Sequence, residues 1–417
     1  MRKNLKQFSF KVLLSELFIV AVVISNVLLI GCNAKVTNKN KDIVENAIND
    51  TSITDETLIE LTNTPIREEP RFNSVYIEKT IDEFNALGFV YGDSVDITFS
   101  NGYKLDDIPY YNGYYGSTGG SLLVAYPGYD YIAVCITNGD GLWQIGKFKN
   151  GDTANIVLRE RGKYKTNQDL LNKYTHNRAD YGSDEIFANF RNVKVGNLKE
   201  NILYRGASPI DNRYNRAKYA NDLMEKVGIK YDIDLSDNED DLKKHFEKDD
   251  FNSNYFKALY DDGKYVALSM KMNYKSKEFA EKIVKAMTAM AQNTGPYYVH
   301  CVEGKDRTGF LCMVIEGLAG ANYDEIVNDY MLSYKNYYGI DDKEEIECYN
   351  IIKEKNIDDM LRYIADSDPT GGTKDLELDE IDWVNVMGRY LTNNGMTDED
   401  IDKWYKNLTQ ENYSDPD

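Results

Sequence analysis

The spacing of apolar residues divides the chain into regions of different periodicity. Between about 76 and 165, apolar and polar residues alternate, as they do at 95–99 and 132–136, and this alternation is typical of strands with one buried face. Turn sequences rich in Asn, Asp and Gly separate these runs, for example at 100–102 and 150–152. We therefore predict a small all-β domain, a barrel or a sandwich, over 76–165.

From about 166 onward the apolar residues follow a helical spacing that is interrupted by short strands. Helical spacing occurs at 219–227 and 279–290, and strands follow at 229–235 and 297–299. Further helices are predicted at 309–318, 323–331, 384–391 and 397–408. This alternation predicts an α/β domain over 166–417, with a central, mostly parallel sheet flanked by helices. In such a domain, a loop between a strand and a helix is the expected place for a bound anion.

The N-terminus has the features of an export signal. Basic residues at positions 2, 3, 6 and 11 precede an apolar run over 12–30, which ends in Leu29-Ile30-Gly31-Cys32. This order is typical of a bacterial lipoprotein signal. We predict a signal peptide over 1–31, lipidation of Cys32 and a flexible polar tether over 32–75. The protein would then be lipid-anchored to a bacterial cell membrane and face away from the cytoplasm; the alternative is a membrane-spanning helix.

The overall charge narrows the range of partners. The net charge of −20 argues against nucleic acid as a partner and requires any anionic substrate to be held by a local positive site. The three His residues, at 176, 245 and 300, are far apart in the sequence, which disfavours a His-rich metal site. We interpret the 33 Tyr residues as a compositional bias.

The segment with the clearest chemistry is His300-Cys301-Val302-Glu303-Gly304-Lys305-Asp306-Arg307-Thr308-Gly309. A cysteine six residues before an arginine can place its sulfur beneath a ring of backbone N–H groups, which favour the thiolate. The same donors can hold phosphoryl oxygens, and Arg307 can bind two of them at once. We predict that Cys301 is a nucleophile toward phosphorus, in a reaction that needs neither a metal nor another cofactor.

The other loop residues have expected supporting roles. Substrate contacts are expected from Val302, Glu303, Gly304, Lys305 and Thr308, and support of the loop from His300 and Gly309. Thr308 can also hydrogen-bond the thiolate. Lys305 is expected to bind phosphate or a lipid headgroup, the alternative being a solvated surface lysine.

Two assignments stay open on the residues alone. The leaving oxygen needs a general acid, for which the candidates are Asp306, Asp234, Asp261 and Asp262. Arg205 is either an accessory phosphate contact or a packed salt bridge.

The loop resembles the signature HCxxGxxR(S/T)G of the tyrosine phosphatase superfamily, and with Lys305 and Asp306 it is similar to the secreted bacterial tyrosine and dual-specificity phosphatases whose loop reads HCxxGKDRTG. The resemblance covers about 170–410. The supporting segments are 190–193, 203–206, Asp329-Tyr330, Tyr390-Leu391 and Gly395-Met396-Thr397. The resemblance implies a cysteine-phosphatase fold and assigns the general acid to Asp306. The sequence departs from the family at Ser236, where an Arg is usual, and at Glu303, where a neutral residue is usual.

The resemblance implies a phosphoester hydrolase that acts on phosphotyrosine proteins or peptides through a cysteinyl-phosphate intermediate. One alternative is a phosphatase of phosphoinositides or inositol phosphates, although Glu303 and the acidic surface oppose polyanionic substrates. The other is a catalytically inactive, phosphate-binding lipoprotein in which the β domain carries the function.

Overall fold

The structure is a computed structural model that describes residues 58–70, 72–114, 120–126, 128–137 and 141–410. The predicted signal peptide, Cys32 and most of the predicted tether therefore lie outside the described residues. Within the described ranges, no helix has both the length and the apolar character required to cross a bilayer.

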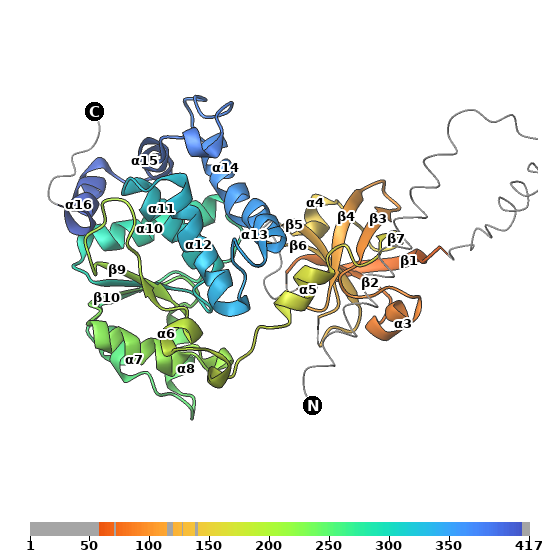
Figure 1. Cartoon of the computed structure of the whole chain (residues 1–417), viewed down its shortest axis with the longest axis horizontal. Coiled ribbons are helices and arrows are strands. Elements are labelled where there is room, and N and C mark those ends of the chain that lie inside the picture. The colour runs from red at the N-terminus through yellow and green to blue at the C-terminus, as the bar shows by residue number, and fades with distance from the viewer. Residues whose placement is uncertain (1–57, 71, 115–119, 127, 138–140, 411–417) are drawn as a thin grey trace, which may run out of the picture. The chain divides into compact units, whose positions relative to one another are not determined.

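The N-terminal part of the described chain is a small closed barrel of seven strands in the order β1-β2-β6-β5-β4-β3-β7 (Figure 1). The strands are β1 (Glu60–Glu69), β2 (Ser74–Ile77), β3 (Ser94–Phe99), β4 (Lys104–Tyr111), β5 (Gly120–Val124), β6 (Ile132–Thr137) and β7 (Thr153–Glu160). Neighbouring strands are antiparallel except β4 and β5, which are parallel. The short helices α3 (Ile81–Ala86) and α4 (Leu142–Ile145) lie in its connections. The predicted all-β domain is confirmed, and it is a barrel.

The barrel begins earlier than the sequence indicated, because β1 and part of β2 fall in the segment assigned to the tether. Along β1 the buried positions are Leu61, Thr64, Ile66 and Glu69. Only two of these four residues are apolar, and a register shift between Leu61 and Thr64 breaks the alternation. A strand whose buried face is half polar does not show the period-two pattern that identified its neighbours.

The C-terminal part is built on a five-stranded sheet in the order β11-β10-β12-β9-β8. Its strands are β8 (Arg191–Asn192), β9 (Leu203–Gly206), β10 (Tyr231–Asp234), β11 (Tyr265–Ala267) and β12 (Tyr297–His300). β11, β10, β12 and β9 run parallel to one another, and β8 is antiparallel to β9. The predicted mixed α/β domain is confirmed.

Helices cover both faces of this sheet, with α6, α7 and α8 on one face and α10, α11 and α12 on the other (Figure 1). The longer helices are α7 (Ala217–Val227), α8 (Glu239–Phe246), α9 (Asn254–Asp261), α10 (Lys277–Gln292), α11 (Asp306–Leu318), α12 (Tyr323–Tyr338), α14 (Asp359–Asp366), α15 (Trp383–Asn393) and α16 (Asp398–Leu408). The shorter ones are α5 (Lys165–Leu171), η1 (Arg178–Asp180), α6 (Asp184–Phe187), η2 (Asn212–Tyr214), α13 (Ile346–Ile352), the π-helical η3 (Lys353–Asp358) and η4 (Leu378–Glu380).

The alternation of side chains along β12 divides the core between the two faces. Tyr297 and Val299 pack with α10 and α11, whereas Tyr298 packs with α7 and α9 on the other face. α11 is buried along nearly its whole length from Thr308 to Leu318. This burial on all sides fixes the start of α11 against the end of β12, and the loop between them is the one singled out in the sequence.

Candidate active site

The loop from Cys301 to Lys305 lies at the carboxyl-terminal edge of the parallel sheet. β12 ends at His300, which pairs with Asp234 of β10 on one side and Gly206 of β9 on the other, and α11 begins at Asp306. The helix N-terminus contributes partial positive charge at this edge, where parallel α/β sheets commonly bind anions.

A buried arginine holds the backbone of the loop from behind. Arg205 on β9 is 1% exposed, and its Nη2 donates to the carbonyl oxygens of Gly304 at 3.0 Å and Lys305 at 3.2 Å. Its Nη1 donates to Asp329 Oδ2 at 2.5 Å, and Arg191 Nε donates to the other oxygen of that carboxylate at 2.8 Å. Of the two possible roles for Arg205, this geometry fits the packed ion pair.

The two preceding carbonyls are also hydrogen-bonded from outside the loop. Ser208 N donates to Val302 O at 3.2 Å, and the Tyr337 hydroxyl donates to Glu303 O at 2.7 Å. The N–H of a trans peptide points opposite to its C=O. Four successive N–H groups, those of residues 303–306, therefore point away from these donors. The N–H groups of residues 303–305 donate to no backbone acceptor among the described residues. They form a set of free donors suited to an anion.

The Cys301 side chain lies in an environment that favours its ionised form. Cys301 is 3% exposed, and burial by itself opposes ionisation. The positive charge of Arg307 and hydrogen bonds from the Thr308 side chain and backbone outweigh it, so the pKa of the Cys301 thiol lies below its ordinary value. In the described part of the chain the buried Thr308 hydroxyl has no other hydrogen-bond partner. The other described cysteines, Cys135, Cys312 and Cys348, are buried and unpaired.

Arg307 is half-buried at the first turn of α11. Its Nη1 donates to the carbonyl oxygen of Met270 at 2.9 Å, which fixes one edge of the guanidinium on the segment after β11. The remaining donors of its planar fork stay available for a phosphoryl group.

Asp306 combines a partly exposed carboxyl group with a raised pKa. Its side chain is 32% exposed, the Tyr330 hydroxyl donates to its Oδ1 at 3.4 Å, and Lys305 Nζ lies 3.8 Å from its Oδ2. Burial raises the pKa of Asp306, and Glu303 adds to that rise, while Lys305 and Arg307 oppose it; the net pKa lies above the ordinary carboxyl value. The proton is therefore retained to a higher pH than on a free aspartate.

The Glu303 carboxylate is hydrogen-bonded by a side chain from outside the loop. The Tyr174 hydroxyl donates to Glu303 Oε1 at 2.5 Å. The Tyr174 ring lies against the buried Arg216 guanidinium, 4.8 Å from its Cζ. Arg216 is also close enough for its charge to act on Glu303. The negative charge of Glu303 is thus partly balanced beside the loop.

His300 supports the loop from the core of the sheet. It is fully buried, and its Nε2 lies 3.1 Å from Asp232 Oδ2 while its Nδ1 lies 3.9 Å from Asp234 Oδ1. Burial opposes protonation, but the two carboxylates raise the pKa of His300 to about 9. His300, Asp232 and Asp234 all have no exposed surface.

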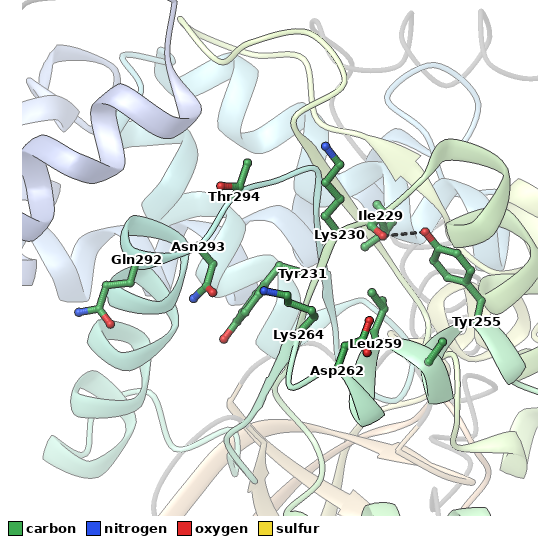
Figure 2. Close-up of a pocket in the computed structure, with 11 residues that line it drawn as sticks. Ile229, Lys230, Tyr231, Tyr255, Leu259, Asp262, Lys264, Gln292, Asn293 and Thr294 are labelled. Carbon is green, nitrogen blue, oxygen red and sulfur yellow. Dashed lines mark hydrogen bonds between the residues drawn. The ribbon is translucent and has the colours of Figure 1, made fainter.

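The structure separates the other candidate acids from the loop or constrains them. Asp234 is fully buried, and its Oδ1 accepts hydrogen bonds from Ser236 N at 2.7 Å and Asp237 N at 3.1 Å. Asp261 and Asp262 precede β11 and so lie at the opposite, amino-terminal edge of the parallel sheet. Asp262 lines a cavity of about 570 Å³ at that edge, which Lys230 and Lys264 also line (Figure 2). No residue of the Cys301 loop lines that cavity.

The predicted site residues are thus brought together at one edge of the sheet, but Lys305 is buried, with 5% of its side chain exposed. Sequence reasoning missed the residues that hold the loop from distant segments: Tyr174, Asn189, Ser208, Met270, Ser333 and Tyr337. Asn189, for example, has φ of 50°, and its Nδ2 donates to Gly304 O at 3.1 Å and Ser333 Oγ at 3.1 Å.

In the described ranges, no group of three or more His, Cys, Asp or Glu side chains is placed to hold a metal ion.

A thiol of lowered pKa, an adjacent arginine and a cradle of N–H groups at the start of a helix define the class of cysteine-dependent phosphatases. The family model for the tyrosine phosphatase family matches residues 175–410. The chain belongs to the tyrosine phosphatase family, and the superfamily expected from the loop is confirmed.

Comparison with solved structures gives weaker similarities. The core catalytic domain of the PP-IP phosphatase SIW14 from S. cerevisiae, in complex with citrate, is 21% identical with a TM-score of 0.26, over 42% of this chain and 90% of that one. An uncharacterized conserved protein from Thermotoga maritima is 18% identical with a TM-score of 0.19, over 23% of this chain and 35% of that one. At these TM-scores the similarities support no statement about fold or function. No curated protein matches the chain.

Replacement of Gly304 by Ala should disrupt the loop. Gly304 has φ of +67°, and a Cβ there would lie 2.1 Å from the backbone oxygen of Gly206. We expect Gly304→Ala to lower kcat/KM for p-nitrophenyl phosphate by at least about tenfold, because the backbone must move away from the positions that direct its N–H groups. Gly339→Ala is the matched control, since Gly339 has φ of +71° with nothing within 4 Å of a Cβ. Equal urea midpoints and equal activities for the two variants would contradict the steric argument.

Proposed function

We propose that the protein hydrolyses phosphate monoesters by a two-step mechanism that uses Cys301, Arg307 and Asp306. The observation that carries the proposal is the buried Cys301 thiol, whose pKa is lowered beside Arg307 and Thr308. A thiolate is the reactive form of cysteine, and this one lies next to a cradle of donors that can neutralise a phosphoryl group.

In the first step the Cys301 thiolate attacks phosphorus, so that a P–S bond forms and the bond to the leaving oxygen breaks. Asp306 gives its proton to that oxygen, and Arg307 with the loop N–H groups holds the three other phosphoryl oxygens. In the second step water attacks phosphorus and gives a proton to the Asp306 carboxylate. The P–S bond breaks, inorganic phosphate leaves, and the thiolate and the protonated acid are restored.

Phosphotyrosine in proteins or peptides is the substrate class that we propose first. The Cys301 sulfur is buried, and an aryl phosphate presents its phosphorus farther from the peptide backbone than a seryl phosphate does. Inositol polyphosphates need several cations around the entrance. Here Lys305 is buried and Glu303 carries negative charge beside the loop. Monophosphorylated inositides are a slower second class, and inositol hexakisphosphate is a poor substrate.

We also propose that the chain is a bacterial lipoprotein, anchored through lipidated Cys32 with its catalytic domain outside the cytoplasm. The support is the order of basic residues, apolar run and Leu29-Ile30-Gly31-Cys32 at the N-terminus.

Replacement of the nucleophile should abolish turnover and spare anion binding. In Cys301→Ser the N–H groups and Arg307 remain, so orthovanadate should still bind. Hydrolysis of p-nitrophenyl phosphate in the presence of EDTA should fall below about 1% of the wild-type rate, because loss of a nucleophile costs several orders of magnitude. Cys312→Ala is the control: burial raises the pKa of Cys312 to about 12, so its thiol stays protonated and its loss should spare activity. Wild-type protein that binds vanadate but releases no phosphate would instead indicate an inactive phosphate-binding protein.

The substrate ranking and its dependence on Glu303 can be measured together. At fixed ionic strength, kcat/KM should be highest for phosphotyrosine peptides, lower for monophosphorylated inositides and lowest for inositol hexakisphosphate. Glu303→Lys should raise kcat/KM for the inositides more than for the peptides. Each unit of charge changed contributes about 1 kcal/mol, which corresponds to roughly a fivefold change in kcat/KM. Glu303→Gln should have an intermediate effect. A wild-type enzyme most active on the hexakisphosphate would show that the role given to Glu303 is wrong.

Lipidation of Cys32 should decide where the protein is found. Cys32→Ala should move the protein from the membrane fraction to a soluble or uncleaved form, because stable anchoring requires the acyl chains carried by the cysteine. Fractionation and gel mobility report the two properties. Unchanged partitioning with unchanged mobility would favour an uncleaved membrane helix. Cys135→Ala, a change on the barrel strand β6, is the control and should leave both unchanged.

A further inference from the structure

Lys305 lies between two aromatic rings and is almost fully buried. Its Nζ lies 5.1 Å from the ring centroid of Tyr334 and 5.5 Å from that of Tyr338, within the range of cation–π attraction. It also lies 3.5 Å from the Tyr338 hydroxyl oxygen. With 5% of its side chain exposed, the Lys305 ammonium is held against α12 by these rings.

The two rings beside Lys305 belong to a row of three tyrosines on one face of α12. Tyr330, Tyr334 and Tyr338 recur at every fourth residue, so their rings follow one another along the helix, each tilted against the next. Their successive centroids are 6.0 Å and 5.8 Å apart, and all three residues are at most 2% exposed. We call these three residues the tyrosine ladder.

The tyrosine ladder also reaches the proposed acid. Tyr330, at its first position, donates to Asp306 Oδ1 at 3.4 Å, and Lys305 Nζ lies 3.8 Å from Asp306 Oδ2. Each carboxylate oxygen of Asp306 therefore has a partner from this arrangement. Asp306 is 32% exposed where Lys305 is 5% exposed, so the carboxyl group is the more accessible of the two.

The backbone of Lys305 is fixed as well. Its carbonyl oxygen accepts from Arg205 Nη2 at 3.2 Å and from Gly309 N at 2.7 Å. A side chain that starts from a fixed backbone and ends between two buried rings has little freedom to swing toward the loop entrance.

We propose that Lys305 is a positioning residue for Asp306, held in place by the tyrosine ladder. This inference rests on the proposed function, in which Asp306 is the general acid. The charged and titratable groups around Asp306 belong to the loop with the first turn of α11 and to α12: Cys301, Glu303, Lys305, Arg307, Tyr330, Tyr334 and Tyr338. Among them Lys305 is the largest influence that lowers the pKa of Asp306.

The experiment is the pH dependence of kcat/KM for phenyl phosphate, a poor leaving group that needs the acid. Protonated Asp306 sets the basic limb of this profile. Lys305→Met keeps a long side chain between the rings but removes the charge, so the pKa of Asp306 should rise and the basic limb should move to higher pH by about one unit. Lys305→Arg restores the charge and should return the limb toward the wild-type position. Lys335→Met, on the exposed side of α12 with 58% of its side chain exposed, is the control and should not move it.

Tyr330→Phe provides a second variant if Lys305→Met folds poorly. It removes the hydroxyl that donates to Asp306 and keeps the ring, so it should also shift the limb upward, by less than Lys305→Met. An unmoved limb in both folded variants would overturn the inference. So would a loss in Lys305→Met that is confined to phosphoinositides and inositol hexakisphosphate, because that result would place Lys305 at the substrate.

Asp306→Asn separates this inference from the proposed function. If Asp306 is the acid, this variant should lose the basic limb and should lose more activity on phenyl phosphate than on p-nitrophenyl phosphate. A profile for Asp306→Asn that keeps its basic limb would refute the acid assignment itself, and the positioning role of Lys305 would fall with it. With the acid assignment intact, only the Lys305 and Tyr330 variants decide the inference.

Discussion

The buried guanidinium of Arg205 is the interaction on which the active-site loop depends. It binds two consecutive loop carbonyls through one nitrogen and Asp329 through another. A guanidinium that is 1% exposed is stable in its charged form only beside a close anion and with most of its donors hydrogen-bonded. Loss of one partner of such a buried ion pair typically lowers the free energy of unfolding by about 3–5 kcal/mol. Asp329 supplies the close anion, which it shares with Arg191, while the Arg205 Nε has no hydrogen-bond partner among the described residues. The direction of two of the loop N–H groups is thus set by an ion pair on the far side of their peptide planes.

Groups close to the loop, and not the overall charge, explain how an acidic protein can hold a phosphate. The chain carries a net charge of −20, so attraction must come from groups within a few ångströms, because longer-range fields are screened. Arg307 supplies the accessible positive charge, and the loop N–H groups and the first turn of α11 add dipoles. Glu303 is hydrogen-bonded to Tyr174 and lies in the field of Arg216, which weakens its repulsion of the substrate.

The sequence predicted the parts of the site that are contiguous and missed those that are not. The place of the residues from His300 to Gly309, between a strand and a helix, could be predicted because a strand, a loop and an apolar helix follow one another and periodicity identifies the strand and the helix. Asn189 and Met270 reach the loop through the tertiary fold, and nothing in their own neighbourhood indicates a partner. Lys305 shows the limit within the loop itself: its position in the motif suggested phosphate, whereas its surroundings on α12, about 30 residues later, are what bury it. Likewise β1 was missed because half of its buried face is polar.

The abundance of tyrosine, interpreted from composition as a bias, also serves the site. Tyr174, Tyr330, Tyr334, Tyr337 and Tyr338 all contact the loop or its charged side chains. A buried tyrosine offers a ring face to a cation and a hydroxyl donor to a carboxylate or carbonyl. Burial, the largest influence, raises the pKa of each of the five above its ordinary value, so they stay neutral over the pH range in which Cys301 and Asp306 change charge. Phenylalanine would lack the donors, and histidine would add a charge that titrates with the catalytic groups. Tyrosine gives this loop polar partners whose electrostatics remain constant while the chemistry proceeds.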